Sequence, residues 1–351
     1  MTALSVRRGG PGSEVPGPRR RLPGVRLLGL VVALVALAVL LVLSVMVGST
    51  AIAPSVVWDA LVRSGSGIDW FAVRDYRLPR TVVGLVVGVA LGLSGALIQA
   101  LTRNPLADPG LLGVHAGASF AVTVAVGLFG VREVHGYLWF AFAGALVVTL
   151  MVLALGSTRQ GSSPVFMVLA GLCVGAVLGG ARDALQLTDP AAFDMLRTWS
   201  AGSTAGRPLE VVWPVLPFFA VALVLAVAVS GSLNAMALGD ETAVAQGVRL
   251  LRTRVLAILA LTLLAGGATA IAGPIAFVGL MVPHVARWIV GPHQRWIFVY
   301  SAVLGPALLL ASDILGRVVI RPGEIPVGVV TAFVGAPVLI LLARRRKASG
   351  L

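Results

Sequence analysis

Hydrophobic residues form long, nearly unbroken runs along most of the chain, and short polar segments between the runs hold most of the charges. A helix that crosses a bilayer needs about 20 apolar residues, which matches these runs. The short alternating strands typical of a membrane β-barrel are not seen. The pattern predicts ten spans: Val25–Val47, Thr81–Leu101, Gly113–Gly130, Tyr137–Gly156, Pro164–Leu187, Leu209–Ser230, Val255–Ala272, Pro274–Val290, Trp296–Leu315 and Ile325–Ala343.

Composition agrees with this pattern. Of 351 residues, 58% are hydrophobic and only 12% are charged, about half the charged share of a soluble domain. A soluble fold could not hide so much apolar surface, and a disordered chain would not contain it. We therefore expect an all-α polytopic membrane protein: a disordered tail over 1–23, a ten-helix transmembrane domain over 24–346 and a short tail over 347–351.

Basic residues predict the orientation. The net charge is +13, and arginines cluster beside the apolar runs, which favours a role in membrane orientation over nucleic-acid binding. An even number of spans places both arginine-rich ends, together with Arg249, Arg252 and Arg254, on one side. We expect that side to be cytoplasmic.

The segment between the first two spans breaks this rule, since it should be outside yet contains Arg63, Arg74, Arg77 and Arg80. One interpretation is a solvated loop with local ion pairs. The other is a surface that meets an acidic partner.

Few residues here could carry covalent or gradient-driven chemistry. The single cysteine, Cys173, excludes a disulfide framework, and the single lysine, Lys347, excludes a P-loop, so any ATP must bind another subunit. Charges inside the spans are scarce, which argues against a proton- or sodium-coupled carrier. Asp313 and Arg317 are four residues apart and could pair on one helix face. Glycines every four residues, at Gly84, Gly88 and Gly92, favour close helix packing.

Seven stretches, taken in order, resemble the permease subunits of type II ABC importers for ferric siderophores, haem and cobalamin, the FecCD-like family. They are Arg77–Thr81, Gly95–Ala100, Asn104–Gly113, Ala237–Glu241, Gly273–His284, Glu324–Thr331 and Gly335–Val338. The resemblance covers most of the chain. It implies two permease subunits, identical or related, around a path lined largely by spans five, eight and ten, with spans two to five and seven to ten as inverted repeats.

The resemblance also implies partners and roles. The partners would be ABC ATPase subunits, a periplasmic or lipid-anchored substrate-binding protein and membrane lipid, with no cofactor and no nucleic acid. The segment Ala237–Gly247 matches the helix that couples the permease to the ATPase. Its alternative interpretation is a plain amphipathic connector. The coupling residues would be Ala237, Leu238, Gly239, Asp240, Glu241, Ala243, Gln246 and Gly247.

Two further sites follow from the same resemblance. Arg77, Arg80 and Arg317 match outward arginines that pair with carboxylates of the binding protein, although Arg317 could instead pair with Asp313. The loop between spans four and five matches the inner gate, with the candidate residues Ser157, Thr158, Ser162 and Ser163.

The expected function is therefore that of a permease subunit that moves ferric siderophores across the cytoplasmic membrane and catalyses nothing covalent itself. Cobalamin or haem import is the alternative within the family. A gradient-driven carrier is the alternative from another class, and a membrane enzyme has no recognisable catalytic residues here.

Overall fold

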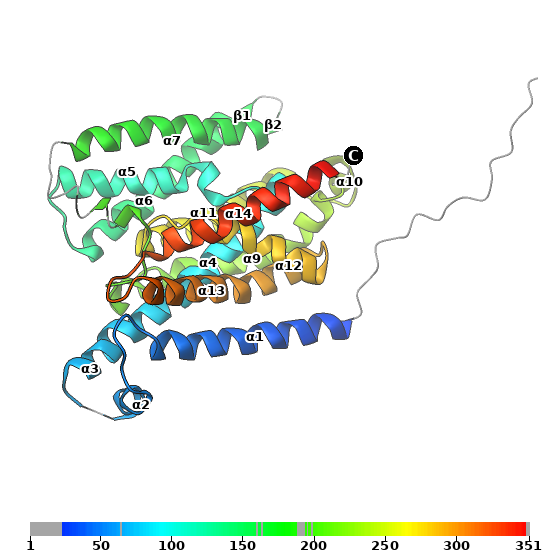
Figure 1. The fold of residues 1–351 in the computed structure, drawn as a ribbon. Coiled ribbons are helices and arrows are strands. Elements are labelled where there is room, and N and C mark those ends of the chain that lie inside the picture. Colours follow the sequence, from blue (N-terminus) through cyan, green and yellow to red (C-terminus); the bar gives the residue numbers. More distant parts are fainter. Residues whose placement is uncertain are drawn as a thin grey trace, which may run out of the picture.

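The computed structural model describes residues 23–63, 65–158, 161–162, 164–187, 194, 196–197 and 199–348. Its helices pack side by side into one bundle (Figure 1). The longer helices are α1 (Pro23–Met46), α4 (Leu78–Thr102), α5 (Val114–Gly127), α6 (Val134–Gly156), α7 (Pro164–Gln186), α9 (Leu216–Met236), α11 (Leu250–Ala272), α12 (Val278–Val290), α13 (Gln294–Val319) and α14 (Val327–Ala348). The shorter elements are α2 (Pro54–Val62), α3 (Ile68–Phe71), η1 (Ala72–Arg77), η2 (Pro109–Leu112), η3 (Leu209–Val211), α10 (Asp240–Ala245), β1 (Ser157–Thr158) and β2 (Gly161–Ser162).

The ten longer helices correspond one for one to the ten predicted spans. Within the described residues, seven helices are long and apolar enough to cross a bilayer, and three shorter apolar helices, Val114–Gly127, Val278–Val290 and Val327–Val338, accompany them. The start of α1 and the end of α14 lie at the same end of the bundle, as does α10 (Figure 1). The prediction of an all-α membrane fold is confirmed. The predicted tail over 1–23 lies outside the described residues, except for Pro23.

Several predicted boundaries are wrong by up to seven residues, and each has a local cause. The sixth span begins at Leu216 and not at Leu209, because the short turn η3 precedes it. The eighth begins at Val278 and not at Pro274. Gly273 (φ +75°) and Phe277 (φ +70°) hold the chain between α11 and α12 out of helical geometry, as a Gly-Pro break after α11 would predict.

The predicted outer loop that carries Arg74, Arg77 and Arg80 is largely helical. A continuous helical segment of 35 residues runs over Ile68–Thr102 and combines α3, the π-helical η1 and α4. These arginines therefore lie on the first turns of a membrane helix, where the bundle can cover them.

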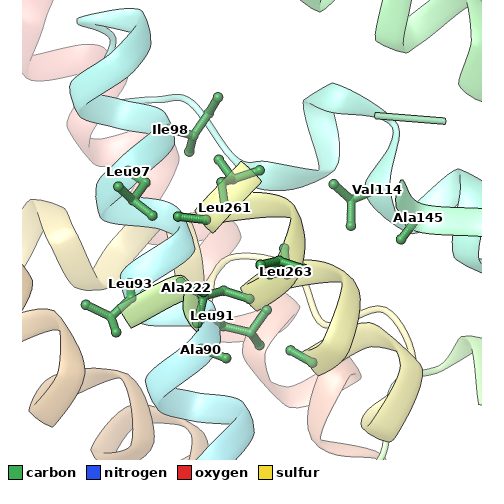
Figure 2. Close-up of a cluster of buried hydrophobic side chains, with 14 of the residues drawn as sticks. Ala90, Leu91, Leu93, Leu97, Ile98, Val114, Ala145, Ala222, Leu261 and Leu263 are labelled. Atoms are coloured by element: carbon green, nitrogen blue, oxygen red, sulfur yellow. The ribbon is translucent and has the colours of Figure 1, made fainter. Parts of the chain in front are cut away.

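Helices α4 and α11 form the centre of the bundle. In the apolar stretch that would cross the membrane, 78% of the residues of the segment containing α4 and 83% of those of α11 are buried. Helix α4 packs against α11, α12 and α13. Leu93, Leu97 and Ile98 of α4 lie beside Leu261 of α11 in this core (Figure 2).

The predicted glycine ladder permits the close approach of α4 and α13. A Cβ added at Gly88 would lie 2.3 Å from the Cα of Pro306, and one added at Gly92 would lie 2.4 Å from the carbonyl oxygen of Ser301. Small residues at these positions let two backbones touch, which drives helix association in lipid.

Candidate functional site

The segment predicted to couple the permease to an ATPase contains a helix of its own. Helix α10 begins after Gly239, whose φ of +117° is readily adopted only by glycine. Asp240 and Glu241 occupy its first turn, as expected from the favourable interaction of acidic side chains with a helix N-terminus. The helix follows α9 and precedes α11 in the chain, and it lies at the end of the bundle that also holds the start of α1 and the end of α14 (Figure 1).

The side chains that this segment exposes include two large apolar ones. Ala243 is fully buried against the protein's own core, so its side chain is not presented to a partner. Leu238 and Val244 are instead 69% and 56% exposed. Large apolar side chains at the polar end of a membrane bundle are typical of a surface that another protein covers.

Asp240 connects α10 to the centre of the bundle. Its Oδ2 atom accepts a hydrogen bond of 2.6 Å from the guanidinium of Arg254 on α11. Its Oδ1 atom accepts one from Arg103, the left-handed residue (φ +52°) that ends α4. One carboxylate of the coupling segment thus contacts the two most buried helices.

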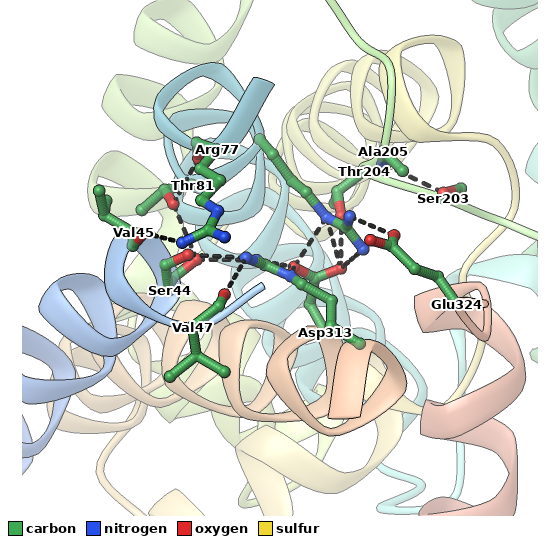
Figure 3. A network of polar contacts seen from close by, with 12 residues as sticks. Ser44, Val45, Val47, Arg77, Thr81, Ser203, Thr204, Ala205, Asp313 and Glu324 are labelled. Atoms are coloured by element: carbon green, nitrogen blue, oxygen red, sulfur yellow. Dashed lines mark hydrogen bonds and ion pairs between the residues drawn. The ribbon is translucent and has the colours of Figure 1, made fainter. Parts of the chain in front are cut away.

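A second polar cluster lies at the opposite end of the bundle and is centred on Asp313 of α13 (Figure 3). We call it the outer arginine network, and its end of the bundle the outer end, after the side on which the basic residues of the sequence predict it to lie. Arg80 donates from Nε and Nη2 to this carboxylate at 2.8–3.1 Å, and from Nη1 to Glu324 at 2.5 Å. Arg317 donates to the same carboxylate from Nε at 3.0 Å, and the Thr204 hydroxyl donates at 2.9 Å. All the side chains of the network except Glu324 are buried.

Two arginines of this network also hold the end of α1. Arg317 donates to the carbonyls of Ser44 (2.6 Å) and Val47 (3.0 Å). Arg77 donates to those of Val45 (3.2 Å) and Met46 (2.8 Å). The last carbonyls of a helix lack intrahelical partners and carry partial negative charge, so cationic donors stabilise them.

These contacts change the interpretation of the three predicted docking arginines. The sequence suggested that they face outward, but each is at most 3% exposed, and every guanidinium bonds within the chain. The competing pair, Asp313 with Arg317, is present. A role in docking stays a prediction, and it would require the network to open.

The loop predicted as the inner gate folds into a minimal hairpin. Ser157 pairs with Ser162 and Thr158 with Gly161 in antiparallel register. Ser163 lies outside the described residues. The hairpin connects α6 to α7 at the end of the bundle that holds α10 (Figure 1), and its gating role stays a prediction.

Three members of the outer network were missed at the sequence level. Glu324 belongs to a recognised motif but had no assigned role, and Ser44 and Thr204 had none. Thr204 bonds Asp313 across 109 positions, Glu324 bonds Arg80 across 244 and Ser44 bonds Arg317 across 273, so these side chains join the network only after the bundle forms. Within the described residues, no group of three or more His, Cys, Asp or Glu side chains could hold a metal.

The bundle of ten apolar helices with a short helix at one polar end defines a polytopic membrane protein. The model of the FecCD transport family matches residues 36–345, and the chain belongs to that family. It is 50% identical over 309 residues to the ferric enterobactin transport system permease protein FepD of Escherichia coli (strain K12), covering 88% of this chain and 92% of that protein.

Other relatives agree with this assignment. A probable siderophore transport system permease protein, YfiZ of Bacillus subtilis (strain 168), is 37% identical, with coverage of 86% of this chain and 91% of that protein. A solved structure described as an inward-facing conformation of a metal-chelate type ABC transporter superposes with a TM-score of 0.79 at 25% identity, covering 92% of this chain and all of that one. The relatives are transport permeases, in agreement with the expectation that this chain is a transport subunit.

Proposed function

We propose that the protein is the membrane permease of an ABC importer that moves ferric siderophore complexes across the cytoplasmic membrane. The observation that carries this proposal is the similarity to siderophore permeases along nearly the whole chain. Ferric enterobactin is the first substrate to test, because the relative with 50% identity is described as its permease.

Energy would come from a separate ATPase subunit that contacts the segment Ala237–Gly247. Exposed Leu238 and Val244 supply an apolar contact surface, and Asp240 ties that surface to Arg254 on α11 and Arg103 at the end of α4. A displacement of α10 would therefore pull on the two central helices and not only on a surface loop. The absence of a P-loop lysine from the chain is consistent with ATP binding elsewhere.

The end of the bundle with α10 would face the cytoplasm, and the arginine network would face outside. In this arrangement the network holds α1, α4 and α13 together at the outer end. Carboxylates of a docked binding protein could compete with Asp313 and Glu324 for Arg80. Docking would then loosen the outer end while cargo is delivered. A second permease subunit, identical or related, would complete the path.

Uptake by cells tests the substrate. Cells that lack this gene should fail to accumulate iron-55 supplied as ferric enterobactin, and a plasmid copy should restore uptake. Uptake of ferric hydroxamates, ferric citrate, haem and labelled cobalamin should be measured in the same cells for comparison. Normal uptake of every ferric siderophore in the deletion strain, with loss of cobalamin or haem uptake, would overturn the siderophore proposal.

Reconstitution tests the energy source and the coupling surface. Transport into proteoliposomes should require the ATPase subunit and ATP, and an ion gradient should not replace them. Leu238→Asp and Val244→Asp should abolish transport without lowering thermal stability, because both side chains are exposed. Val62→Asp is the matched control, since Val62 is 64% exposed on α2 at the opposite end. Equal losses in the control and the test variants would contradict a specific ATPase contact.

A further inference from the structure

A cavity of about 600 Å³ lies between the last turns of α9 and the first turns of α11, beside the coupling segment. Gln246 and Gly247, which follow α10, line part of it. Gly231 of α9 borders this open space, since a Cβ added there would meet only Arg295 Nη2, at 3.9 Å. The polar side chains that line the cavity include those of Ser232, Arg249, Arg252 and Thr253.

Positive charge dominates this cavity. Arg249 and Arg252 line it, Arg295 reaches its edge, and the described residues that form its lining include no carboxylate. None of these three arginines forms an ion pair with a described residue, whereas Arg254 on the same helix is paired with Asp240. Asp240 on the neighbouring α10 already pairs with Arg254 and Arg103, so among the described residues no ion pair compensates the charge of the cavity arginines.

Hydrogen-bond donors converge on the same space. Thr253 lines the cavity and is only 5% exposed, yet its hydroxyl makes no hydrogen bond to any described residue. Thr262 and Thr269, further along α11, donate to the carbonyls of Ile258 (2.8 Å) and Ala265 (2.7 Å). The start of α11 has no side-chain cap either, so its first backbone N–H groups need an acceptor. Arginines, the hydroxyl of Thr253 and a helix N-terminus together favour an anion with several acceptor oxygens, such as a phosphate.

The surroundings of the cavity indicate that a phosphate bound there would be the headgroup of a lipid. Both of its helices are candidate membrane spans. Above the polar mouth, α9 exposes Val221, Val224 and Val227, and α11 exposes Val255 and Leu259. Acyl chains can lie along such apolar faces while the headgroup enters the cavity, and basic pockets between membrane helices on the cytoplasmic side bind anionic headgroups.

We propose that this cavity is a binding site for the phosphate headgroup of an anionic phospholipid, held by Arg249, Arg252 and Thr253 next to the coupling segment. Its location in the cytoplasmic leaflet rests on the orientation proposed above. The binding itself does not depend on that orientation or on the cargo.

Native mass spectrometry of the purified full chain tests the site, with phosphatidylglycerol and phosphatidylcholine of identical acyl chains as probes. The wild type should retain phosphatidylglycerol in preference to phosphatidylcholine. The double variant Arg249→Gln/Arg252→Gln should weaken this binding roughly 30-fold, because each arginine near an anionic headgroup contributes about 1 kcal/mol. Thr253→Val, which keeps the side-chain volume, should weaken it roughly threefold to tenfold.

Controls separate a specific site from a general charge effect. Gly231→Leu should block the cavity and abolish retention, whereas Gly127→Leu, at another helix position with open space around the new Cβ, should not. Arg132→Gln/Arg321→Gln removes two exposed charges elsewhere and should leave binding unchanged. Equal retention of the two lipids, equal weakening in this control, or binding of inorganic phosphate without phosphatidylglycerol would overturn the proposal. Thiol labelling of intact cells from outside tests the orientation separately, with Val62→Cys and Thr242→Cys each placed in a Cys173→Ala background. If the α10 end faces the cytoplasm, Val62→Cys should react and Thr242→Cys should not.

Discussion

The two ends of the bundle use the same pair of chemical groups in different ways. At the outer end, Asp313 holds Arg80 and Arg317 with side chains at most 2% exposed. At the other end, Asp240 holds Arg103 and Arg254, and these side chains are 22–40% exposed. The residue types alone would not distinguish the two clusters.

Burial decides what each cluster can do. A buried charge that loses its partner remains desolvated, so removing one partner typically costs 3–5 kcal/mol. Half-exposed pairs contribute about 0–1 kcal/mol because water and salt compete with them. The outer network is therefore suited to hold helices together, and the Asp240 cluster is suited to connect α10 to α4 and α11 without contributing much to the stability of the fold.

The first prediction removes the centre of the outer network. Asp313→Ala leaves buried Arg317 without a carboxylate and leaves Arg80 with Glu324 alone, so we expect a loss of about 3–5 kcal/mol in unfolding free energy and little transport. Thermal unfolding of the purified protein in detergent measures the effect. Asp59→Ala, which breaks the exposed Asp59–Arg63 pair, is the control and should change stability by no more than about 1 kcal/mol. Similar unfolding temperatures for the two variants would contradict the importance of burial.

The second prediction concerns volume inside the coupling segment. Ala243→Leu should cost about 1–3 kcal/mol through overpacking, because Ala243 is buried in the chain itself. Gly239→Val should cost a similar amount, because valine is strained at a φ of +117°. Thr242→Leu, an exposed change on the same helix, is the control for stability. If Ala243→Leu lowers transport without any change in stability, Ala243 contacts a partner and the packing explanation is wrong.

The third prediction tests whether the outer network yields to a docked protein. Glu324→Gln removes the carboxylate that competes for one edge of Arg80. If Arg80 meets a carboxylate of the binding protein, affinity should rise by a factor of up to about ten, or about 1.4 kcal/mol. The gain should shrink as salt increases, since charges are screened over about 8–10 Å at physiological ionic strength. Titration calorimetry with the purified binding protein measures it, and unchanged affinity would leave Arg80 with an internal role alone.

The fourth and smallest effect on stability is expected at Asp240. Asp240→Asn should lower the unfolding free energy by no more than about 1 kcal/mol, because the pairs with Arg103 and Arg254 are partly solvated. ATP-driven transport should nevertheless fall several-fold, since α10 would lose its connection to α4 and α11. Glu241→Gln changes the next residue on the same helix and should retain activity. Full transport by the Asp240 variant would show that the connection is dispensable.

The sequence predicted the spans well because their signal is local. Each run of apolar residues specifies a helix without reference to the rest of the chain, and Gly273 followed by Pro274 locates the break between α11 and α12. The ladder of Gly84, Gly88 and Gly92 likewise predicts close packing from spacing alone. The predicted start of a helix was less accurate where a short turn precedes it, as η3 precedes α9.

The composition and motifs of the sequence thus determined the class of protein, its ten helices and its family, and they predicted where the segment that couples to an ATPase would lie. Only the tertiary structure decided what the arginines touch. Arg80 and Asp313 are 233 positions apart, and Arg317 meets Ser44 across 273. No local pattern encodes such pairs, because their energy depends on burial and on which helices become neighbours. The same reason hid the cavity at Arg249 and Arg252: these two basic residues at the start of α11 line a cavity only because α9 packs beside α11 and encloses the space.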